Sequence, residues 1–171
     1  MADSLMGTRV FVSRTKPTLP AKIIEDANNA AAVTANTAAR IAAWTTFDDG
    51  TVFTEVEGVV TVGNLGATFT MNTTTLLKNG LERPSKGSVN AGSGDFTLLY
   101  YKDDPGQEII RRVGLSRDTC AFRYDYPDNE SRYFIAHVGG DAIEGGDANT
   151  NKQMTAELTL DDFQVVVNND V

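Results

Sequence analysis

The sequence predicts a mainly β protein, an antiparallel β-sandwich or barrel with one flanking α-helix. Residues 51–62 and 152–160 alternate between apolar and polar side chains, which is typical of strands that bury one face. A turn at residues 127–130 separates two aromatic-rich runs and predicts a hairpin. Between the strands, residues 104–114 carry both the start and the stop signals of one helix. Strands in series with a single inserted helix favour this fold class.

The composition limits the classes of protein to consider. The chain has 171 residues and a formal net charge of −8, so it is long enough for one domain with a core. An acidic chain is a poor candidate for binding duplex DNA, because such proteins need a basic surface. The only cysteine, Cys120, excludes an internal disulfide. The sequence holds no apolar run that could cross a bilayer and no signal-peptide pattern at its N-terminus, and we expect no membrane partner.

The first 50 residues differ in composition from the rest. Residues 10–12 are apolar and predict a small strand, which two following prolines would end. Residues 23–43 are rich in alanine, which favours helix, but asparagine and threonine dilute that propensity. They predict a weak connecting helix or, alternatively, a mobile linker. We expect residues 1–50 to form an N-terminal arm that includes this alanine-rich segment, and residues 51–171 to form the β domain.

The longest predicted strand is residues 51–62. Its alternation places four valines on one face and Glu55 and Glu57 on the other. In residues 152–160, Glu157 lies on the polar face, opposite the apolar side chains. Such strands suit a sheet that packs one face on its own core and turns the other toward solvent or a partner.

Residues 63–92 are dominated by glycine, asparagine, serine and threonine, and they predict a long loop with at most a short strand at residues 67–71. Structureless loops of this length are uncommon inside compact domains and are usually functional or disordered. The loop has too many apolar side chains for a solvated linker and too few for a second domain, namely Phe69, Met71, Leu76, Leu77 and Leu81. We expect it to be mobile in the free protein and to order on a neighbouring molecule.

The predicted helix has a signal at each end. Asp104 is suited to the N-cap, and Pro105 fits the first helical position, where a missing N–H costs nothing. Gln107 completes the spacing of a capping box. We expect Gly114 to end the helix in the left-handed conformation, with Leu115 folded back on the helix. The apolar stripe of this helix consists of Ile109, Ile110 and Val113.

The sequence offers few candidates for catalysis or metal binding. The single histidine, His137, and Cys120 both lie in predicted strands and near no catalytic motif. Acidic residues in the glycine-rich segment 139–151 supply oxygens of the kind that bind calcium, but their spacing is not that of an EF-hand, and we expect a solvated hairpin loop. We therefore predict no catalytic residue, no metal site and no cofactor. An alternative is a small hydrolase that uses an Asp/Glu pair.

Several short pieces of the sequence, taken in order, resemble a known family. They are Val56-Glu57-Gly58-Val59, residues 87–94 and 96–100, Pro105-Gly106-Gln107 at the start of the helix, and residues 152–162. Their order and layout resemble the major tail tube protein of long, flexible-tailed (siphovirus-type) bacteriophages. The resemblance spans residues 51–167, and the helix start is its most specific part.

The resemblance implies a tail-tube fold and a structural role in the virion tail. Hexameric rings of such subunits stack into a tube, assembled in the host bacterial cytoplasm, that conducts DNA to the host cell without binding it specifically. The implied partners are other copies of the same chain, the tail tip and tail terminator proteins, and a tape measure protein in the lumen. We then expect Glu55, Glu57 and Glu157 to line the lumen, where they would repel DNA phosphates, and the long loop to join ring to ring.

A different class of function also fits the predicted fold, a carbohydrate-binding or decoration β-module of a phage tail. Carbohydrate binding of this kind would need exposed tryptophan platforms, and Trp44 is the only tryptophan. Electron microscopy of the purified protein separates the two hypotheses, because only a tube subunit would form rings or tubes.

Overall fold

The computed structural model describes residues 6–20, 30–77, 80–145 and 151–169. As the sequence predicts, the protein is mainly β, with an eight-stranded antiparallel sheet, a separate two-stranded sheet and two helices. The elements in chain order are β1 (Arg9–Ser13), α1 (Ala30–Phe47), β2 (Thr54–Val56), β3 (Val59–Val62), β4 (Thr68–Thr75), β5 (Glu82–Asn90), β6 (Ser93–Leu99), α2 (Pro105–Gly114), β7 (Thr119–Asp125), β8 (Glu130–Glu144), β9 (Gln153–Leu160) and β10 (Val165–Asn168).

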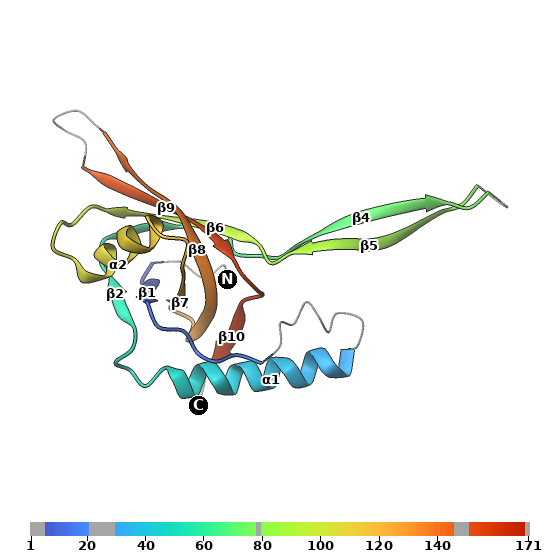
Figure 1. Ribbon diagram of the computed structural model, residues 1–171, viewed down its shortest axis with the longest axis horizontal. Helices are drawn as coiled ribbons and strands as arrows, with labels where there is room; N and C mark the ends of the chain where they lie inside the picture. Colours follow the sequence, from blue (N-terminus) through green and yellow to red (C-terminus); the bar gives the residue numbers. More distant parts are fainter. Residues whose placement is uncertain (1–5, 21–29, 78–79, 146–150, 170–171) are drawn as a thin grey trace.

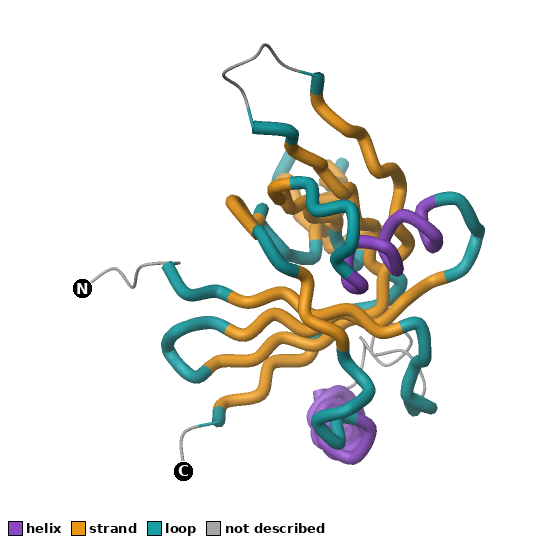
Figure 2. The backbone as a smooth tube through the Cα atoms, turned by 90° about the vertical axis from the view of Figure 1, so that its left-hand side faces the viewer, coloured by secondary structure: helices purple, strands orange, loops and turns teal. Residues whose placement is uncertain are grey.

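The larger sheet curls around one core (Figures 1 and 2). Its strand order is β2-β1-β7-β8-β9-β6-β3, and β10 pairs with β8 beside this path. β2 and β3 lie at opposite ends of the order although only Glu57 and Gly58 separate them in the chain, so the sheet must bend back on itself. The enclosed core is aromatic at its centre, where Phe122 stacks on Phe134 with ring centroids 5.4 Å apart. The alternation predicted for residues 152–160 is confirmed, because the apolar side chains of β9 are buried in this core.

The predicted strand at residues 51–62 is too long, because a tight turn divides it into β2 and β3. Gly58 has φ = +76°, a backbone conformation that favours glycine. A β-carbon there would lie 2.7 Å from the Tyr101 ring, so the position also needs glycine for space. The alternation changes after the turn, since Val56 is 2 % exposed and Val60 is 51 % exposed. The four valines therefore do not share one face.

α1 is docked on the sheet, where the sequence predicts a weak helix or a mobile linker. Trp44, near the end of α1, is fully buried and packs on Tyr133 with ring centroids 5.3 Å apart. Asp48 accepts a hydrogen bond from the Tyr133 hydroxyl at 2.8 Å and forms an ion pair with Arg123 at 2.6 Å. Tertiary packing of this kind supplies most of the stability of a helix. Residues 21–29, which belong to the same prediction, lie outside the described residues.

The first 50 residues contribute to the β domain itself, whereas we expected an arm outside it. β1 pairs with β2 on one side and with β7 on the other. α1 lies against β10, and the two helices lie on different parts of the sheet (Figures 1 and 2). The boundary expected at residue 50 therefore falls within one fold, and the described residues contain two helices, whereas the predicted fold class has one flanking helix.

α2 has the predicted N-cap and first residue, but the capping box does not form, because the Gln107 side chain is hydrogen-bonded to other segments, and the helix ends differently. The Asp104 carboxylate accepts a hydrogen bond from the Gln107 N–H at 2.8 Å, and Pro105 is the first helical residue. Gly114 is the last residue of the helix and is not left-handed, and Leu115 has ordinary right-handed φ and ψ of −87° and −7° and is exposed. The backbone N–H and the hydroxyl of the next residue, Ser116, both donate to the last turn of the helix. Both donors reach the Val113 carbonyl, so this carbonyl is satisfied without a left-handed glycine.

Replacing Gly114 by alanine should therefore stabilise the protein. Glycine costs about 0.5–1 kcal/mol relative to alanine inside a helix, and an added β-carbon would meet Val138 Cγ1 at 3.5 Å, an ordinary contact. The free energy of unfolding in urea should rise by about that amount. A fall in the free energy of unfolding would instead indicate that Gly114 has the left-handed conformation that the sequence suggested.

Residues 63–92, predicted as a long loop with at most a short strand at residues 67–71, contain the β4–β5 hairpin. β4 is rich in threonine, a β-branched residue that favours strands. At the tip, the Leu76 N–H donates to the Leu81 carbonyl at 2.9 Å, and the Gly80 N–H donates to the Leu76 carbonyl at 2.8 Å. Both faces of this ribbon are exposed. No alternation between buried and exposed positions was therefore available to reveal the strands in the sequence.

Residues 139–144 also belong to a strand, where the sequence predicts a solvated loop. β8 continues to Glu144, which pairs with Gln153 of β9. The two strands extend together beyond the body of the sheet (Figure 1). The register shifts between Val138 and Gly140, where this extension begins. Residues 146–150 lie outside the described residues.

Candidate assembly surfaces

The β4–β5 hairpin projects from the sheet as a free-standing ribbon (Figure 1). Its ladder runs from the Thr68–Asn90 pair to the Thr75–Glu82 pair. An isolated two-stranded hairpin is at best marginally stable in water. Apolar side chains exposed together mark surfaces that bind other molecules, and the hairpin exposes all five that the sequence analysis singled out, namely Phe69, Met71, Leu76, Leu77 and Leu81. The hairpin is therefore a candidate surface for binding another molecule.

The base of the hairpin is fixed to the sheet by a close backbone contact. Gly92 has φ = +116°, and a β-carbon there would lie 2.1 Å from the Gly66 carbonyl oxygen. The Gly92 carbonyl accepts a hydrogen bond from the Leu160 N–H at 3.0 Å. Leu65 and Ala91, on either side of the hairpin, pack against the core. The two ends of the hairpin therefore meet at one place on the curled sheet.

The outward side of β6 and β9 is polar. The Thr97 and Thr155 hydroxyl groups form a hydrogen bond across these strands at 3.1 Å. Two residues further along, Asp95 lies directly opposite Glu157, and both residues are exposed. Like charges placed opposite each other destabilise a sheet, so this carboxylate pair is a candidate functional feature. We call these four residues the outer polar face.

The three glutamates predicted to share one surface lie in different places. Glu157 is on the outer polar face, and Glu57 is exposed in the turn between β2 and β3. Glu55, on β2, forms an ion pair with Arg9 at 2.5 Å, and the hydrogen bonds from that guanidinium lower the pKa of Glu55. The sequence analysis missed Asp95, although the alternation along β6 would have placed it on a polar face.

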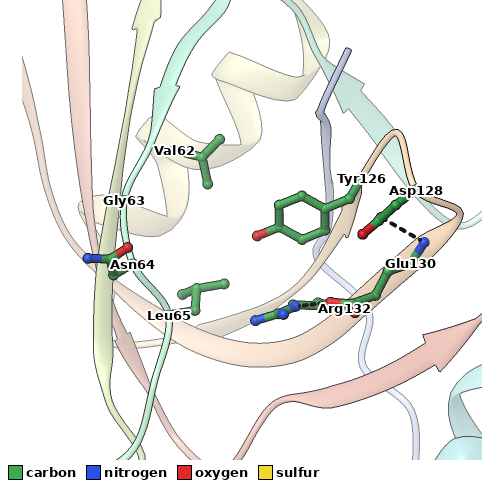
Figure 3. Close-up of a pocket in the computed structure, with 8 residues that line it drawn as sticks. All are labelled: Val62, Gly63, Asn64, Leu65, Tyr126, Asp128, Glu130 and Arg132. Atoms are coloured by element: carbon green, nitrogen blue, oxygen red, sulfur yellow. Dashed lines mark hydrogen bonds and ion pairs between the residues drawn. The ribbon is translucent and has the colours of Figure 1, made fainter. Parts of the chain in front are cut away.

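A pocket of about 310 Å³ opens beside β3, close to the base of the hairpin (Figure 3). The Tyr126 ring points into it, 5.3 Å from the Arg132 guanidinium carbon, and burial raises the pKa of Tyr126. Glu130 forms an ion pair with Arg132. We call this the β3 pocket, and its lining consists of Val62, Gly63, Asn64, Leu65, Tyr126, Asp128, Glu130 and Arg132.

Sequence reasoning identified residues 127–130 only as a turn and missed the β3 pocket. The pocket joins the end of β3 to the turn between β7 and β8. These segments are far apart in the chain and meet only because the sheet curls, so no local signal could have revealed the pocket.

The structure shows the surroundings of several candidate residues for catalysis and binding. Cys120 is fully buried, and burial raises the pKa of its thiol to about 12, so the thiol is protonated at neutral pH. Among the residues described, no group of three His, Cys, Asp or Glu side chains could hold a metal ion. Trp44 is fully buried and offers no platform for a sugar. Neither helix in the described part of the chain has the length and apolar character of a membrane span.

Comparison with known proteins shows a likeness of fold. No protein-family model and no curated protein matches the sequence. A chain from the tail of an empty gene transfer agent particle with C6 symmetry matches with a TM-score of 0.56 and 12 % identity, over 68 % of this chain and 87 % of that chain. A chain of the SPP1 tail tube matches with a TM-score of 0.58 and 11 % identity, over 98 % of this chain and 81 % of that chain.

A third solved structure with a similar fold is a baseplate. A chain of the anti-feeding prophage baseplate has a TM-score of 0.55 and 14 % identity, over 70 % of this chain and 86 % of that chain. The chain described here therefore has the fold found in components of a tail, a tail tube and a baseplate, the tail-tube fold.

Proposed function

We propose that this protein is the subunit of a bacteriophage tail tube, in which hexameric rings stack and conduct DNA to the host cell. The observation that carries the proposal is the β4–β5 hairpin, which exposes apolar side chains on a ribbon that has no core of its own. Repeated head-to-tail contacts between identical copies would cover such a ribbon. The likeness of fold to a C6-symmetric tail and to a tail tube supports rings of six copies.

Open sheet edges support the contacts within a ring. Among the described strands, β2 pairs only with β1, and β3 pairs only with β6. Unpaired edges offer backbone groups to a further strand, and proteins either cover or use them. We infer that neighbouring copies cover these edges around the ring, while the β4–β5 hairpin reaches the adjacent ring.

The outer polar face is proposed to line the lumen. Asp95 and Glu157 would repel the phosphates of passing DNA, so that DNA moves through without specific binding. Glu55 is less suited to this role than the sequence suggested, because Arg9 balances its charge. Glu57 stays a candidate for lining the lumen, since it is exposed in the turn between β2 and β3.

The proposed role also names partners and a location. The subunit would act in the virion tail after assembly in the host bacterial cytoplasm. It would bind other copies of itself, the tail tip and tail terminator proteins, and a tape measure protein inside the lumen. The role is structural, with no enzymatic step and no cofactor.

Removal of the hairpin tests the proposed function. Replacing residues 68–90 by a short Gly/Ser turn should leave a folded, soluble protein, because the two ends already meet at Gly66 and Gly92. The shortened protein should form no extended tubes in negative-stain images, whereas the wild type should. Circular dichroism and thermal unfolding would establish that the shortened protein is folded.

A milder variant controls for loss of the ribbon itself. Serine at positions 76, 77 and 81 keeps the backbone ladder and removes the apolar side chains of the tip. This variant should also form no extended tubes. Tubes of normal length from both variants would refute the hairpin as the contact between rings.

Charge reversal tests the proposed lumen. Asp95→Lys with Glu157→Lys should still fold, because both side chains are exposed and the change only exchanges one pair of like charges for another. Tubes of this variant should retain DNA at low salt and release it as the salt concentration rises. The matched control places the same two charge changes at Glu108 and Asp118, which are exposed outside the outer polar face. Equal DNA retention by both variants would count against this assignment.

A further inference from the structure

We propose that the β3 pocket receives the tip of the β4–β5 hairpin from a neighbouring copy of this chain. The leucines of the tip would lie on the apolar floor of the pocket, and Arg83 would lie against its acidic rim. This inference rests on the proposed function and deepens it, because it names the surface of the neighbour that the hairpin contacts.

The pocket combines an apolar floor with a negatively charged rim. Val62 and Leu65 lie on one side of it and the Tyr126 ring on the other (Figure 3). On the rim, the Glu130 carboxylate is already paired with Arg132. Asp128 therefore supplies the net negative charge, and it is exposed in the turn between β7 and β8.

The hairpin tip has the complementary chemistry. Leu76, Leu77 and Leu81 are 41 %, 103 % and 61 % exposed. The hydrogen bond from the Leu76 N–H to the Leu81 carbonyl holds two of these residues opposite each other across the tip. Arg83, on β5, is exposed two residues beyond Leu81. Apolar side chains beside a cation match an apolar floor beside a carboxylate, and such matching fixes register and partner choice.

The occupant must come from another molecule. The hairpin leaves the sheet beside the pocket, since Leu65 lines the pocket and β4 begins at Thr68. Strands of this length, at about 3.3 Å per residue, carry the tip on the order of 25 Å from the base. Figure 1 shows the hairpin leading away from the sheet, so the tip cannot fold back into its own pocket.

Disulfide cross-linking between two single-cysteine variants tests this contact. Thr75→Cys lies beside the tip leucines, and Asn64→Cys lies at the pocket without altering its apolar floor. Mixed in equal amounts, assembled and mildly oxidised, the two variants should give a cross-linked dimer. Neither variant alone should do so, and Thr46→Cys on α1, mixed with Thr75→Cys, is the control for random collision. Cys120 is fully buried and does not interfere.

A charge swap provides the second readout. Asp128→Lys and Arg83→Asp should each slow tube growth about tenfold, and their combination in one chain should restore it, because the opposite charges then meet again. Asp128→Asn removes the charge but keeps a side-chain oxygen in the turn, so tubes of this variant should grow at an intermediate rate.

The outcomes separate this inference from the proposed function. Tubes that give no mixed cross-link and grow normally with either reversed charge would overturn the pocket and leave the tail-tube function standing. A wild-type protein that forms no rings or tubes would overturn both. A mixed cross-link together with rescue by the double reversal would establish the contact.

Discussion

Replacing Arg40 by alanine should lower the free energy of unfolding by about 3–5 kcal/mol, because it leaves a buried carboxylate without its partner. The Arg40 guanidinium, on α1, lies 2.8 Å from the Asp162 carboxylate, and the two side chains are 3 % and 7 % exposed. The other oxygen of that carboxylate accepts a hydrogen bond from the Phe163 N–H at 2.8 Å. The ion pair therefore ties α1 to the turn that follows β9.

Urea unfolding followed by tryptophan fluorescence measures this effect directly, because the only tryptophan, Trp44, lies in the contact between α1 and the sheet. The matched control is Arg9→Ala, which breaks an exposed pair with Glu55 and should cost no more than about 1 kcal/mol. The double variant with Arg40→Met and Asp162→Asn should lose less stability than Arg40→Ala, because it leaves no buried charge without a partner. Equal losses for Arg40→Ala and Arg9→Ala would contradict the structural role of the buried pair.

Replacing Gln107 by leucine should destabilise the protein by about 3 kcal/mol, because three partly buried backbone groups lose their partners at once. The Gln107 side chain is fully buried. Its oxygen accepts a hydrogen bond from the Tyr101 N–H at 2.9 Å, and its nitrogen donates to the Leu99 and Glu57 carbonyls at 2.8 Å and 3.1 Å. One side chain thus joins α2 to the end of β6 and to the turn between β2 and β3.

Thermal and urea unfolding should show this loss, and Glu108→Gln is the matched control. Glu108 is the next residue of the same helix and is exposed, so its replacement should change the free energy of unfolding by less than about 0.5 kcal/mol. A Gln107→Leu variant as stable as this control would show that the three hydrogen bonds contribute nothing net.

The start of α2 was predictable from sequence because its causes are local. Asp104 and Pro105 act on the first helical turn, whatever the rest of the chain does. The function of Gln107 was not predictable, because its partners belong to distant segments and the spacing suggested a capping box instead. Gly114 was misjudged because Ser116, and not a left-handed residue, donates to the Val113 carbonyl in the last turn.

The candidate assembly surfaces, too, were predictable only where the cause is local. Alternation along β9 placed Glu157 correctly on a polar face, but only the register of the sheet puts Asp95 opposite it. The β4–β5 hairpin escaped prediction because nothing in it is buried against the rest of the molecule. The β3 pocket escaped prediction because it depends on how the sheet curls.

The attachment of the hairpin at Gly66 and Gly92 has a consequence for how this protein can vary. Because the two ends meet and the ribbon adds nothing to the core, its length and side chains are not constrained by the fold of its own molecule. Selection on the hairpin would act only through the molecule that it contacts. In a set of related sequences, we therefore expect residues 68–90 to change together with their contact surface, while β6 to β9 stay constant in length.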